Sequence, residues 1–325
     1  MKQASITGWG TYVPEKILTN ADLEKMVDTS SEWIIQRTGI EKRYIAAPQE
    51  FSSDLAIKAV QDLQKKYNKS VSDVDFIIVA SSTPDFFFPS LAAQVQHGLE
   101  IRSAGAIDVS AACAGWTYGL ILANSLINSG AFKKILVIGA EVLSKTIDYA
   151  DRAVCILFGD GAAATLVEAI EGESDFLGTH CGSDGSFGSI LYRNAVSTKM
   201  NNHPIIADHK VHQDGLKVFK WAVTNIQKSI LALLEKSNYS LDKIDWFVPH
   251  SANLRMIEAI CQGLEFPIER TLVSVCNYGN TSTASIPLAI VEGIKAKAFK
   301  KGDIVLVYGF GGGLVHAGCI IKWNI

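Results

Sequence analysis

Several features that would place a protein in a common class are missing from this 325-residue chain. The six cysteines, at positions 113, 155, 181, 261, 276 and 319, form no Cys-x-x-Cys pair, which argues against a zinc site and a disulfide framework. No apolar run reaches the roughly 18 residues that a membrane span needs. The net charge of −3 gives no support for nucleic-acid binding, which needs a basic patch. We therefore expect neither a membrane nor a nucleic acid as a partner.

Signals for secretion, metal binding and nucleotide binding are also missing. The start, Met1 to Ser5, leads into a strand-like run without the charged-then-apolar layout of a signal peptide, so we expect a cytoplasmic protein with reduced thiols. The seven histidines show no metal-ligand spacing. The run Phe310-Gly-Gly-Gly-Leu314 lacks the Gly-Lys-Ser/Thr ending of a phosphate loop. Its uncovered backbone N–H groups suit the stabilisation of an oxyanion.

What the chain does contain is an internal duplication. The segment that starts at Asn68 and runs through Asp75 into Phe-Ile-Ile-Val returns as the segment that starts at Asn238 and runs through Asp245 into Trp-Phe-Val-Pro. An Ala-Phe-Lys-Lys run followed by a strand occurs at Ala131 and again at Ala298. Counting back from those two runs predicts that Cys113 lies opposite Asn280.

The hydrophobic pattern predicts strands that alternate with long helices. The expected strands are 5–9, 76–80, 106–109, 135–140, 163–167, 246–249, 272–275, 305–310 and 317–322. The expected helices are 53–67, 90–99, 116–129, 216–236, 253–264 and 286–299. Such alternation predicts an α/β fold with parallel sheets and helices on their faces. We place the boundary of the repeat near Glu168–Gly172, which gives halves of 1–170 and 171–325, and expect 182–208 to be a surface excursion.

Cys113 is the candidate nucleophile. It follows a buried strand and precedes a helix, within small residues (Ala111, Ala112, Ala114 and Gly115) that permit a tight elbow. A thiol at a helix N-terminus is favoured as thiolate by the helix dipole. For the other five cysteines we expect an inert structural role.

His250 and Asn280 are the candidate partners of Cys113. His250 lies between the end of a strand and a new helix, and Asn280 lies in a turn-rich stretch before another helix. If the two halves pack about a pseudo-twofold axis, their strand ends face one cleft. The three side chains would then lie within reach of one another, although they are far apart in the sequence.

Two other interpretations of this Cys-His-Asn set are considered. The order Cys, His, Asn is also that of papain-type thiol proteases, but the local signature around their cysteine is absent and the duplicated α/β layout differs from theirs. A catalytically silent binding homologue would have lost a member of the trio, and all three are present.

The chain resembles the β-ketoacyl-acyl-carrier-protein synthase III family, which has a thiolase-like fold of two duplicated α/β halves layered α-β-α-β-α. The resemblance covers essentially the whole chain. It rests on the motifs Trp33-Ile-Ile-Gln-Arg-Thr-Gly-Ile40, Asp108-Val-Ser-Ala-Ala-Cys-Ala-Gly115, Asp151-Arg152, Phe158-Gly-Asp-Gly-Ala162, Val248-Pro-His-Ser-Ala-Asn-Leu-Arg255, Asn277-Tyr-Gly-Asn-Thr-Ser282 and Gly309-Phe-Gly-Gly-Gly313. Ser251 departs from the pattern, because many members carry Gln there.

The resemblance implies a decarboxylating condensation of an acyl-CoA with malonyl-acyl-carrier protein and no cofactor. It implies Cys113 as nucleophile, the N–H groups of Cys113 and Gly312 as oxyanion donors, and His250 and Asn280 as donors to the enolate. The CoA channel would be lined by Trp33, Arg37, Thr38, Arg152, Gly215, Ala252 and Asn253. Arg255 would contact the carrier protein, and Phe88 would close the partner's acyl pocket in a homodimer. The primer, and the choice between fatty-acid and polyketide priming, stay open here.

Overall fold

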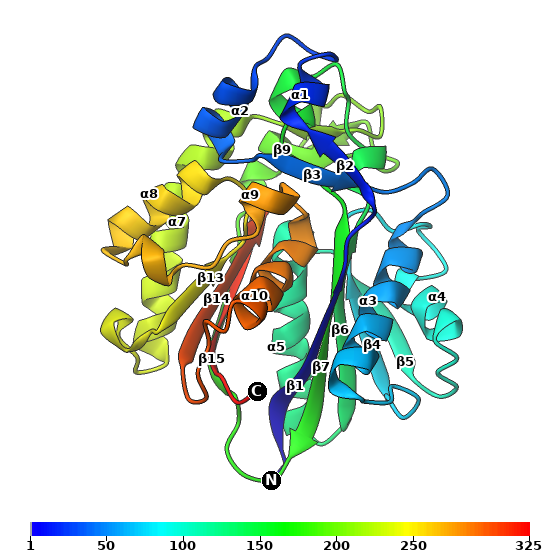
Figure 1. Cartoon of the computed structure of the whole chain (residues 1–325), viewed down its shortest axis with the longest axis vertical. Coiled ribbons are helices and arrows are strands. Elements are labelled where there is room, and N and C mark those ends of the chain that lie inside the picture. Colours follow the sequence, from blue (N-terminus) through cyan, green and yellow to red (C-terminus); the bar gives the residue numbers. More distant parts are fainter. Residues whose placement is uncertain (1) are drawn as a thin grey trace.

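The computed structural model describes residues 2–325, which form two β-sheets with helices around and between them (Figure 1). The first sheet holds, in spatial order, β1 (Gln3–Tyr12), β7 (Gly161–Ile170), β6 (Lys134–Glu141), β4 (Phe76–Ala80) and β5 (Gly105–Val109). The second holds β13 (Trp246–Pro249), β14 (Ile304–Gly311), β15 (Val315–Lys322) and β8 (Phe176–Ser183). We infer that the two halves join in the short segment between β7 and β8.

Both sheets are mixed, so the prediction of parallel sheets is wrong. In the first sheet β4 pairs in parallel with β5 and β6, whereas β7 pairs antiparallel with β6 and β1. The second sheet repeats this pattern, with β13 parallel to β14 and with β15 antiparallel to β14 and β8. The link from β14 to β15 is only three residues long, Gly312 to Leu314. A connection so short can join only antiparallel neighbours, because a parallel pair needs a long crossover.

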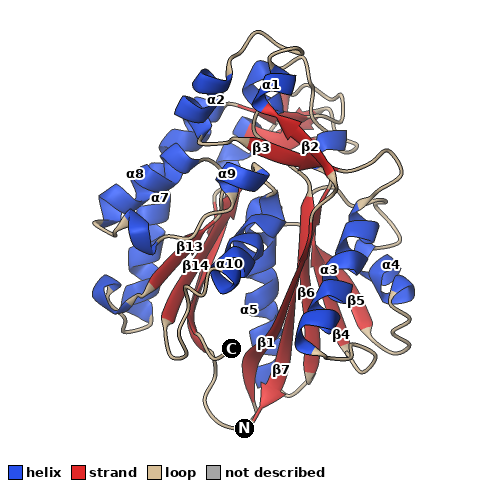
Figure 2. Cartoon of the chain, in the orientation of Figure 1, coloured by secondary structure: helices blue, strands red, loops and turns tan. Residues whose placement is uncertain are grey.

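The helices form three layers around the two sheets, which confirms the α-β-α-β-α arrangement (Figures 1 and 2). Helices α3 (Ser52–Tyr67) and α4 (Leu91–Gly98) cover the outer face of the first sheet. Helices α7 (Gly215–Lys236) and α8 (Leu254–Leu264) cover the outer face of the second. Helices α5 (Gly115–Asn128) and α10 (Ser285–Lys295) lie between the sheets and contact both.

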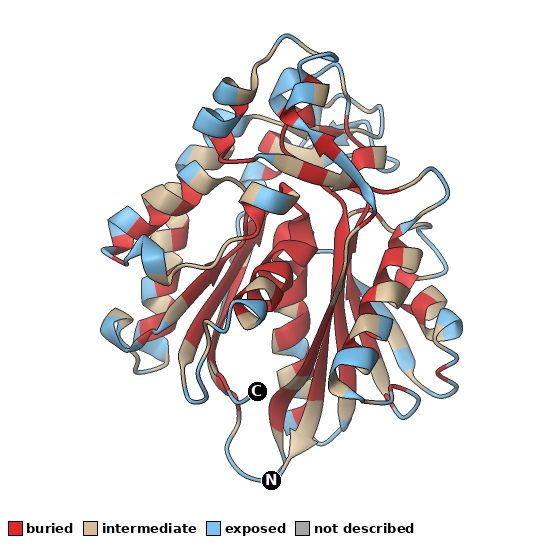
Figure 3. Ribbon diagram, viewed as in Figure 1, coloured by how far each residue is buried: buried red, intermediate tan, exposed pale blue. Residues whose placement is uncertain are grey.

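The central helices are the most buried ones (Figure 3). In α10 every residue from Ser285 to Val291 is buried. In α5 the buried set includes Trp116, Leu120 and Ala123. A helix with a sheet on each side has little face left for water, which explains why these two segments are apolar nearly all round. None of the helices in residues 2–325 is long and apolar enough to cross a membrane.

Smaller elements close the end of the molecule at which the parallel strands terminate. Strands β2 (Lys16–Thr19) and β3 (Lys42–Ile45) form a hairpin, near which lie α1 (Asn20–Leu23), α2 (Ser31–Thr38), α6 (Arg152–Cys155) and α9 (Val275–Tyr278). The expected excursion at 182–208 contains the turn η3 (Gly185–Ile190), β9 (Leu191–Arg193), β10 (Lys199–Met200) and β11 (His203–Pro204). Strand β12 (Val211–Gln213) pairs with β9.

One predicted strand, 272–275, is wrong. Only the preceding residue, Thr271, bridges to Phe247 of β13, and the chain then turns into α9. The N–H group of Ser274 is taken by the Ser251 hydroxyl at 3.0 Å and so is withdrawn from any sheet ladder. The stretch occupies the position that β5 has in the first half, beside the strand equivalent to β4.

The duplication is visible in backbone conformation as well as in sequence. Asn68 and Asn238, which follow α3 and α7, both have positive φ, at 48° and 55°. Gly130 and Lys297, which follow α5 and α10 and precede the two Ala-Phe-Lys-Lys runs, do so as well, at 79° and 54°. These pairs confirm the repeat at both places where the sequence shows it.

Candidate active site

Cys113 lies on the elbow expected from the sequence, in the turn η1 (Ala112–Ala114) between β5 and α5. Ala112 has φ of 43°, a left-handed conformation that a side chain larger than alanine would strain further. Gly115 packs closely on Ala80 and Thr283, where a Cβ atom would come within 2.9 Å of the Ala80 Cβ. Gly115 therefore has no room for a side chain, because Ala80 of its own half and Thr283 of the other half both lie against it.

The count that set Cys113 opposite Asn280 is wrong by three residues. The second half has its own elbow, η6 (Ser282–Ala284), in which Ser282 has φ of 49° and α10 starts at Ser285. Ala112 and Ser282 are thus equivalent, and Cys113 corresponds to Thr283. The cause is that α5 has 14 residues and α10 has 11, so a count from beyond the helices carries that difference into the site.

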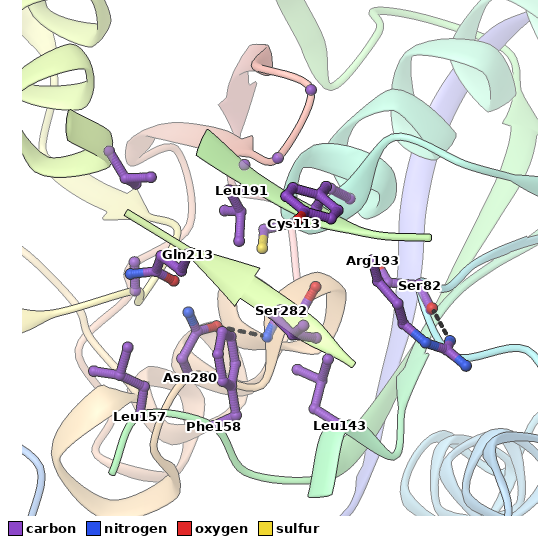
Figure 4. Close-up of a pocket in the computed structure, with 18 of the residues that line it drawn as sticks. Ser82, Cys113, Leu143, Leu157, Phe158, Leu191, Arg193, Gln213, Asn280 and Ser282 are labelled. Atoms are coloured by element: carbon purple, nitrogen blue, oxygen red, sulfur yellow. Dashed lines mark hydrogen bonds between the residues drawn. The ribbon is translucent and has the colours of Figure 1, made fainter. Parts of the chain in front are cut away.

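Cys113, His250 and Asn280 nevertheless line one cavity of about 1160 Å³ (Figure 4). They lie after β5, after β13 and before η6, and the fold brings all three onto the lining of this cavity. The resulting space is bounded by apolar side chains such as Leu143, Leu191 and Phe310. The cluster expected from the pseudo-twofold packing is therefore present.

The asparagine amide has a fixed orientation. The N–H group of Ser282 donates to Asn280 Oδ1 at 2.9 Å, and Figure 4 shows this bond beside Cys113. Asn280 is itself held by main-chain bonds, from its N–H to Leu157 O at 2.8 Å and from Gly159 N–H to its carbonyl at 3.1 Å. With Oδ1 occupied, the Asn280 amide presents its Nδ2 hydrogens as donors.

The ring of His250 is oriented by Ser285, the first residue of the central helix α10. His250 Nδ1 lies 2.7 Å from Ser285 Oγ, which also accepts the N–H of Ser251 at 3.3 Å. No other acceptor for the Ser285 hydroxyl hydrogen is present within residues 2–325. That hydrogen therefore goes to Nδ1, and the ring proton is left on Nε2 as a donor. Burial lowers the pKa of His250 to about 3, so the ring is neutral at physiological pH.

The thiol is in a less favourable setting than the helix N-terminus predicts. Cys113 is buried, and burial is the largest of the effects that raise the pKa of its thiol to about 12. The nearby Ser282 hydroxyl acts in the opposite direction and lowers this pKa, while the charge of Glu141 raises it further. Burial of the thiol therefore opposes the stabilisation of the thiolate that a helix N-terminus provides.

The glycine run after β14 packs directly against the thiol. A Cβ atom on Gly311 would come within 2.7 Å of Cys113 N and 3.1 Å of Cys113 Sγ. Gly312 lines the cavity and lies in the link between β14 and β15. Among residues 2–325 no main-chain carbonyl group accepts a hydrogen bond from its N–H group. A free N–H group beside a nucleophile is what an oxyanion donor requires.

The residues expected along the CoA channel divide into two sets. Those that line the cavity are Trp33, Arg37, Thr38, Gly215, Ala252 and Asn253. Arg152 is not on the lining, but its guanidinium carbon lies 5.0 Å from the centre of the Trp33 ring. Arg37 lies on the same ring at 5.9 Å. Two cationic groups therefore lie close to the Trp33 ring.

Two polar groups in that set already have structural partners. The Thr38 hydroxyl donates to Ile34 O at 2.7 Å and accepts the N–H of Ile40 at 3.0 Å. Asn253 caps α8 by accepting the Arg255 N–H at 2.8 Å, and its amide donates to Arg37 O at 3.2 Å. Both residues shape the channel, and their capacity for further hydrogen bonds is small.

Phe88 and Arg255 lie outside the cavity. Phe88 is 87% exposed, whereas its neighbours Phe86 and Phe87 line the cavity. Arg255 donates through Nε to Gln36 O at 2.8 Å and pairs with Glu258 at 2.9 Å. Its side chain remains half exposed.

Several lining or supporting residues were not anticipated. They are Ser282, Ser285, Glu141, Arg193 and Gln213. The small residues that follow Asn280 resemble those around Cys113. This similarity could have predicted a second elbow, which contains Ser282 and leads to Ser285. Among residues 2–325 there is no group of three or more His, Cys, Asp or Glu side chains that could hold a metal ion.

Fold and site together define a condensing enzyme of thiolase-like architecture. Two family models match: 3-oxoacyl-[acyl-carrier-protein (ACP)] synthase III over residues 107–185, and the C-terminal model of that same family over residues 234–323. The chain is 54% identical to beta-ketoacyl-[acyl-carrier-protein] synthase III 2 of Halalkalibacterium halodurans, over 100% of this chain and 98% of the relative. The chain belongs to the β-ketoacyl-[acyl-carrier-protein] synthase III family, the initiating condensing enzymes of fatty-acid synthesis.

Solved structures agree with this assignment. The β-ketoacyl-[acyl carrier protein] synthase III of Thermus thermophilus superposes with a TM-score of 0.95 at 43% identity, covering 98% of this chain and 99% of that one. A priming β-ketosynthase from the R1128 polyketide pathway gives a TM-score of 0.91 at 31% identity, covering 99% and 97%. The fold is shared by both, and of these two the Thermus thermophilus enzyme has the greater identity to this chain.

Proposed function

We propose that this chain catalyses the decarboxylating Claisen condensation of an acyl-CoA primer with malonyl-acyl-carrier protein. The products are a 3-ketoacyl-carrier protein, CoA and CO₂, and the reaction starts type II fatty-acid synthesis. The observation that carries the proposal is that Cys113, His250 and Asn280 share one cavity with a free N–H group at Gly312.

In the first half-reaction the Cys113 sulfur takes the acyl group from CoA. The carbonyl oxygen becomes an oxyanion in the tetrahedral intermediate, and the N–H groups of Cys113 and Gly312 stabilise it. The close packing of Gly311 on Cys113 supports this assignment, since it holds the glycine backbone against the reacting sulfur. One donor of this kind contributes on the order of 10²–10³ in rate.

In the second half-reaction malonyl thioester loses CO₂, and negative charge develops on its thioester oxygen. Neutral His250 donates from Nε2, and Asn280 donates from Nδ2, to that oxygen. The support is the bond from Ser285 to Nδ1 and the bond from Ser282 to Oδ1, which leave those two hydrogens free. The carbanion then attacks the acyl group on Cys113.

We infer that CoA enters past Trp33, with its adenine between the Trp33 ring and Arg152. Two van der Waals contacts need roughly 7 Å between the flanking groups, and the guanidinium now lies at 5.0 Å. Arg152 must therefore move outward when the nucleotide binds. Arg37, Thr38, Gly215, Ala252 and Asn253 form the channel for the pantetheine arm.

The acyl carrier protein is the second partner in this proposal. Its phosphopantetheine arm would use the same channel, and Arg255 beside the mouth would face acidic groups of the carrier. The half-exposed guanidinium supports this role, although part of its hydrogen-bonding capacity is used by Gln36 and Glu258.

We infer that the working form is a homodimer. Strand β5 is an edge strand of the first sheet, and Ile107 on it is 42% exposed. Unpaired edges with exposed apolar residues favour pairing with a second chain. Phe88, which is 87% exposed, would then reach the acyl pocket of the partner. A cytoplasmic location fits six free cysteines.

Priming of a polyketide is the alternative with the same chemistry. The identity of 54% to a synthase III enzyme, against 31% to a polyketide-priming enzyme, favours fatty-acid initiation. A condensation assay with malonyl-carrier protein and a panel of acyl-CoA donors tests the proposal. We expect ketoacyl product with the wild type and none with Cys113→Ala. A folded dimer without product from any donor would overturn it.

A further inference from the structure

Arg43 of β3 is a fully buried arginine to which the proposed reaction gives no role. Its Nη1 atom donates to Asn20 Oδ1 at 2.7 Å, and its Nη2 atom donates to Ile156 O at 2.5 Å. Both acceptors are neutral, and among residues 2–325 the Nε atom has no hydrogen-bond partner. Burial lowers the pKa of Arg43 to about 10, so the guanidinium group is still charged at neutral pH.

Stability alone does not explain an arginine at this position. A buried cation loses its hydration, and neutral acceptors replace that hydration less well than a carboxylate does. An apolar side chain of similar volume often gives a protein that is equally stable or more stable. The informative feature of Arg43 is therefore which atoms its guanidinium group holds.

Ile156, one of the two acceptors, begins the short segment on which Asn280 rests. The carbonyl of the next residue, Leu157, accepts the Asn280 N–H at 2.8 Å, and the Gly159 N–H donates to Asn280 O at 3.1 Å. Figure 4 shows Leu157 and Asn280 together on the lining of the cavity. The main chain of Asn280 is thus fixed by a segment whose first carbonyl is held by Arg43.

Arg43 also packs directly on the backbone of this segment and of the turn before Asn280. A Cβ atom on Gly159 would come within 3.0 Å of Arg43 Cβ, and one on Gly279 would come within 3.2 Å of it. The two segments are themselves in backbone contact, since a Cβ atom on Gly159 would lie 2.2 Å from Tyr278 O. A shift of Arg43 would therefore reach Asn280 without an intervening side chain to absorb it.

The chain around Arg43 is anchored on both halves of the molecule. Asn20, which accepts from Arg43, donates through its Nδ2 atom to Ile40 O at 2.9 Å. The N–H group of Glu41 donates to Cys276 O, in the second half, at 2.9 Å. These bonds give the guanidinium group a fixed base from which to hold its acceptors.

We propose that Arg43 is a positioning residue that keeps Asn280 in place for condensation, an inference that rests on the proposed role of Asn280 as a donor to the enolate. Arg43 fixes the Ile156 carbonyl, the segment from Ile156 to Gly159 fixes the Asn280 main chain, and the Ser282 N–H group fixes the amide oxygen. The direction of the Asn280 Nδ2 hydrogens follows from these contacts. A displacement of about 1 Å in such a group can cost on the order of 10² in rate.

Hydrogen exchange of the substrate-free protein, followed by mass spectrometry, tests the positioning directly. Arg43→Met keeps a long side chain and removes the donors to Asn20 and Ile156. We expect exchange to become faster by about tenfold or more in the peptides that contain the N–H groups of Gly159 and Asn280, because the segment loses one hydrogen bond to a charged group.

Asp175→Ala is the matched control for this experiment. Asp175 is 1% exposed, accepts from the Ser5 hydroxyl at 2.6 Å and from the Ile6 N–H at 2.8 Å, and does not line the cavity. Its loss should speed exchange at Ile6 and leave the peptide that contains Asn280 within about twofold of the wild type, since the two sites share no partners.

The two half-reactions provide a second readout, which a general loss of folding would not produce. Arg43→Met should slow condensation by about tenfold to hundredfold and leave acyl transfer to Cys113 within about twofold. Because Arg43 acts through Asn280, adding Arg43→Met to Asn280→Ala should lower condensation by less than about twofold further. Arg43→Lys, which keeps the charge and one donor, should show smaller changes of the same sign.

Unchanged exchange around Asn280 in folded Arg43→Met protein would overturn the proposal, and so would an equal loss in both half-reactions. Should Arg43→Met fail to fold, as judged by circular dichroism, Arg43→Lys decides, and wild-type exchange in that variant would overturn the proposal as well. If the wild type neither takes an acyl group nor condenses, the proposed function fails, whereas the exchange rates still decide whether Arg43 holds Asn280.

Discussion

The Nδ1 atom of His250 lies 2.7 Å from the Oγ atom of Ser285, and this contact fixes which ring nitrogen carries the proton. The serine is the first residue of α10, a helix that is buried between the two sheets. The packing of the central layer is thereby linked to the protonation of a residue in the active site.

From this contact we predict the effect of Ser285→Ala. The ring loses the bond that keeps its proton on Nε2, so the condensation half-reaction should slow by about tenfold, the value of one hydrogen bond. Acylation of Cys113, which does not use His250, should keep its wild-type rate. The measurement is malonyl decarboxylation beside acyl transfer from labelled acyl-CoA. Equal loss in both would indicate a general packing defect and contradict the tautomer argument.

The buried His250 also predicts a stability that depends on pH. Its pKa is about 3 in the folded protein and near 6.5 in the unfolded chain, so the unfolded state binds more protons between these values. The contribution is fully present above pH 6.5 and is lost as the pH falls. Between pH 7.5 and pH 5 the wild type should lose about 2 kcal/mol of its free energy of unfolding through this residue. Urea denaturation of the wild type and His250→Gln at both pH values measures the difference, and parallel losses would refute it.

Trp33→Ala should affect the two substrates differently. Stacking of a base on an aromatic ring is worth about 1–3 kcal/mol, so the KM for acyl-CoA should rise roughly tenfold. The carrier protein delivers a pantetheine arm without adenine, so the KM for malonyl-carrier protein should not change. Steady-state kinetics with each substrate varied in turn provides the comparison. A rise in both KM values would place Trp33 at the shared channel and not at the nucleotide.

The edge strand predicts how the proposed dimer can be broken. Ile107→Asp puts a charge on β5, where Ile107 is 42% exposed, and should give a monomer without condensing activity. Leu231→Asp is the matched control, since Leu231 is 50% exposed on the outer helix α7 and should leave the dimer intact. Sedimentation velocity separates the two species. A dimer that survives Ile107→Asp would show that the chains associate through another face.

The sequence was sufficient for the layers of the fold and for the shared position of Cys113, His250 and Asn280. It was misleading about the equivalence of Cys113 and Asn280, because a length difference of three residues between α5 and α10 leaves no trace in a count between motifs. It also missed Glu141 and Ser285. Both are buried, and only the packing of the two halves shows which polar partners they contact.

Transfer of the acyl group to Cys113 is the most direct test of the account. Intact-protein mass spectrometry after incubation with acyl-CoA should show one added acyl group on the wild type, His250→Ala and Asn280→Ala, and none on Cys113→Ala. Only the wild type should then form ketoacyl product with malonyl-carrier protein. An acyl group on Cys113→Ala, or condensation by that variant, would contradict the assignment of Cys113 as the nucleophile.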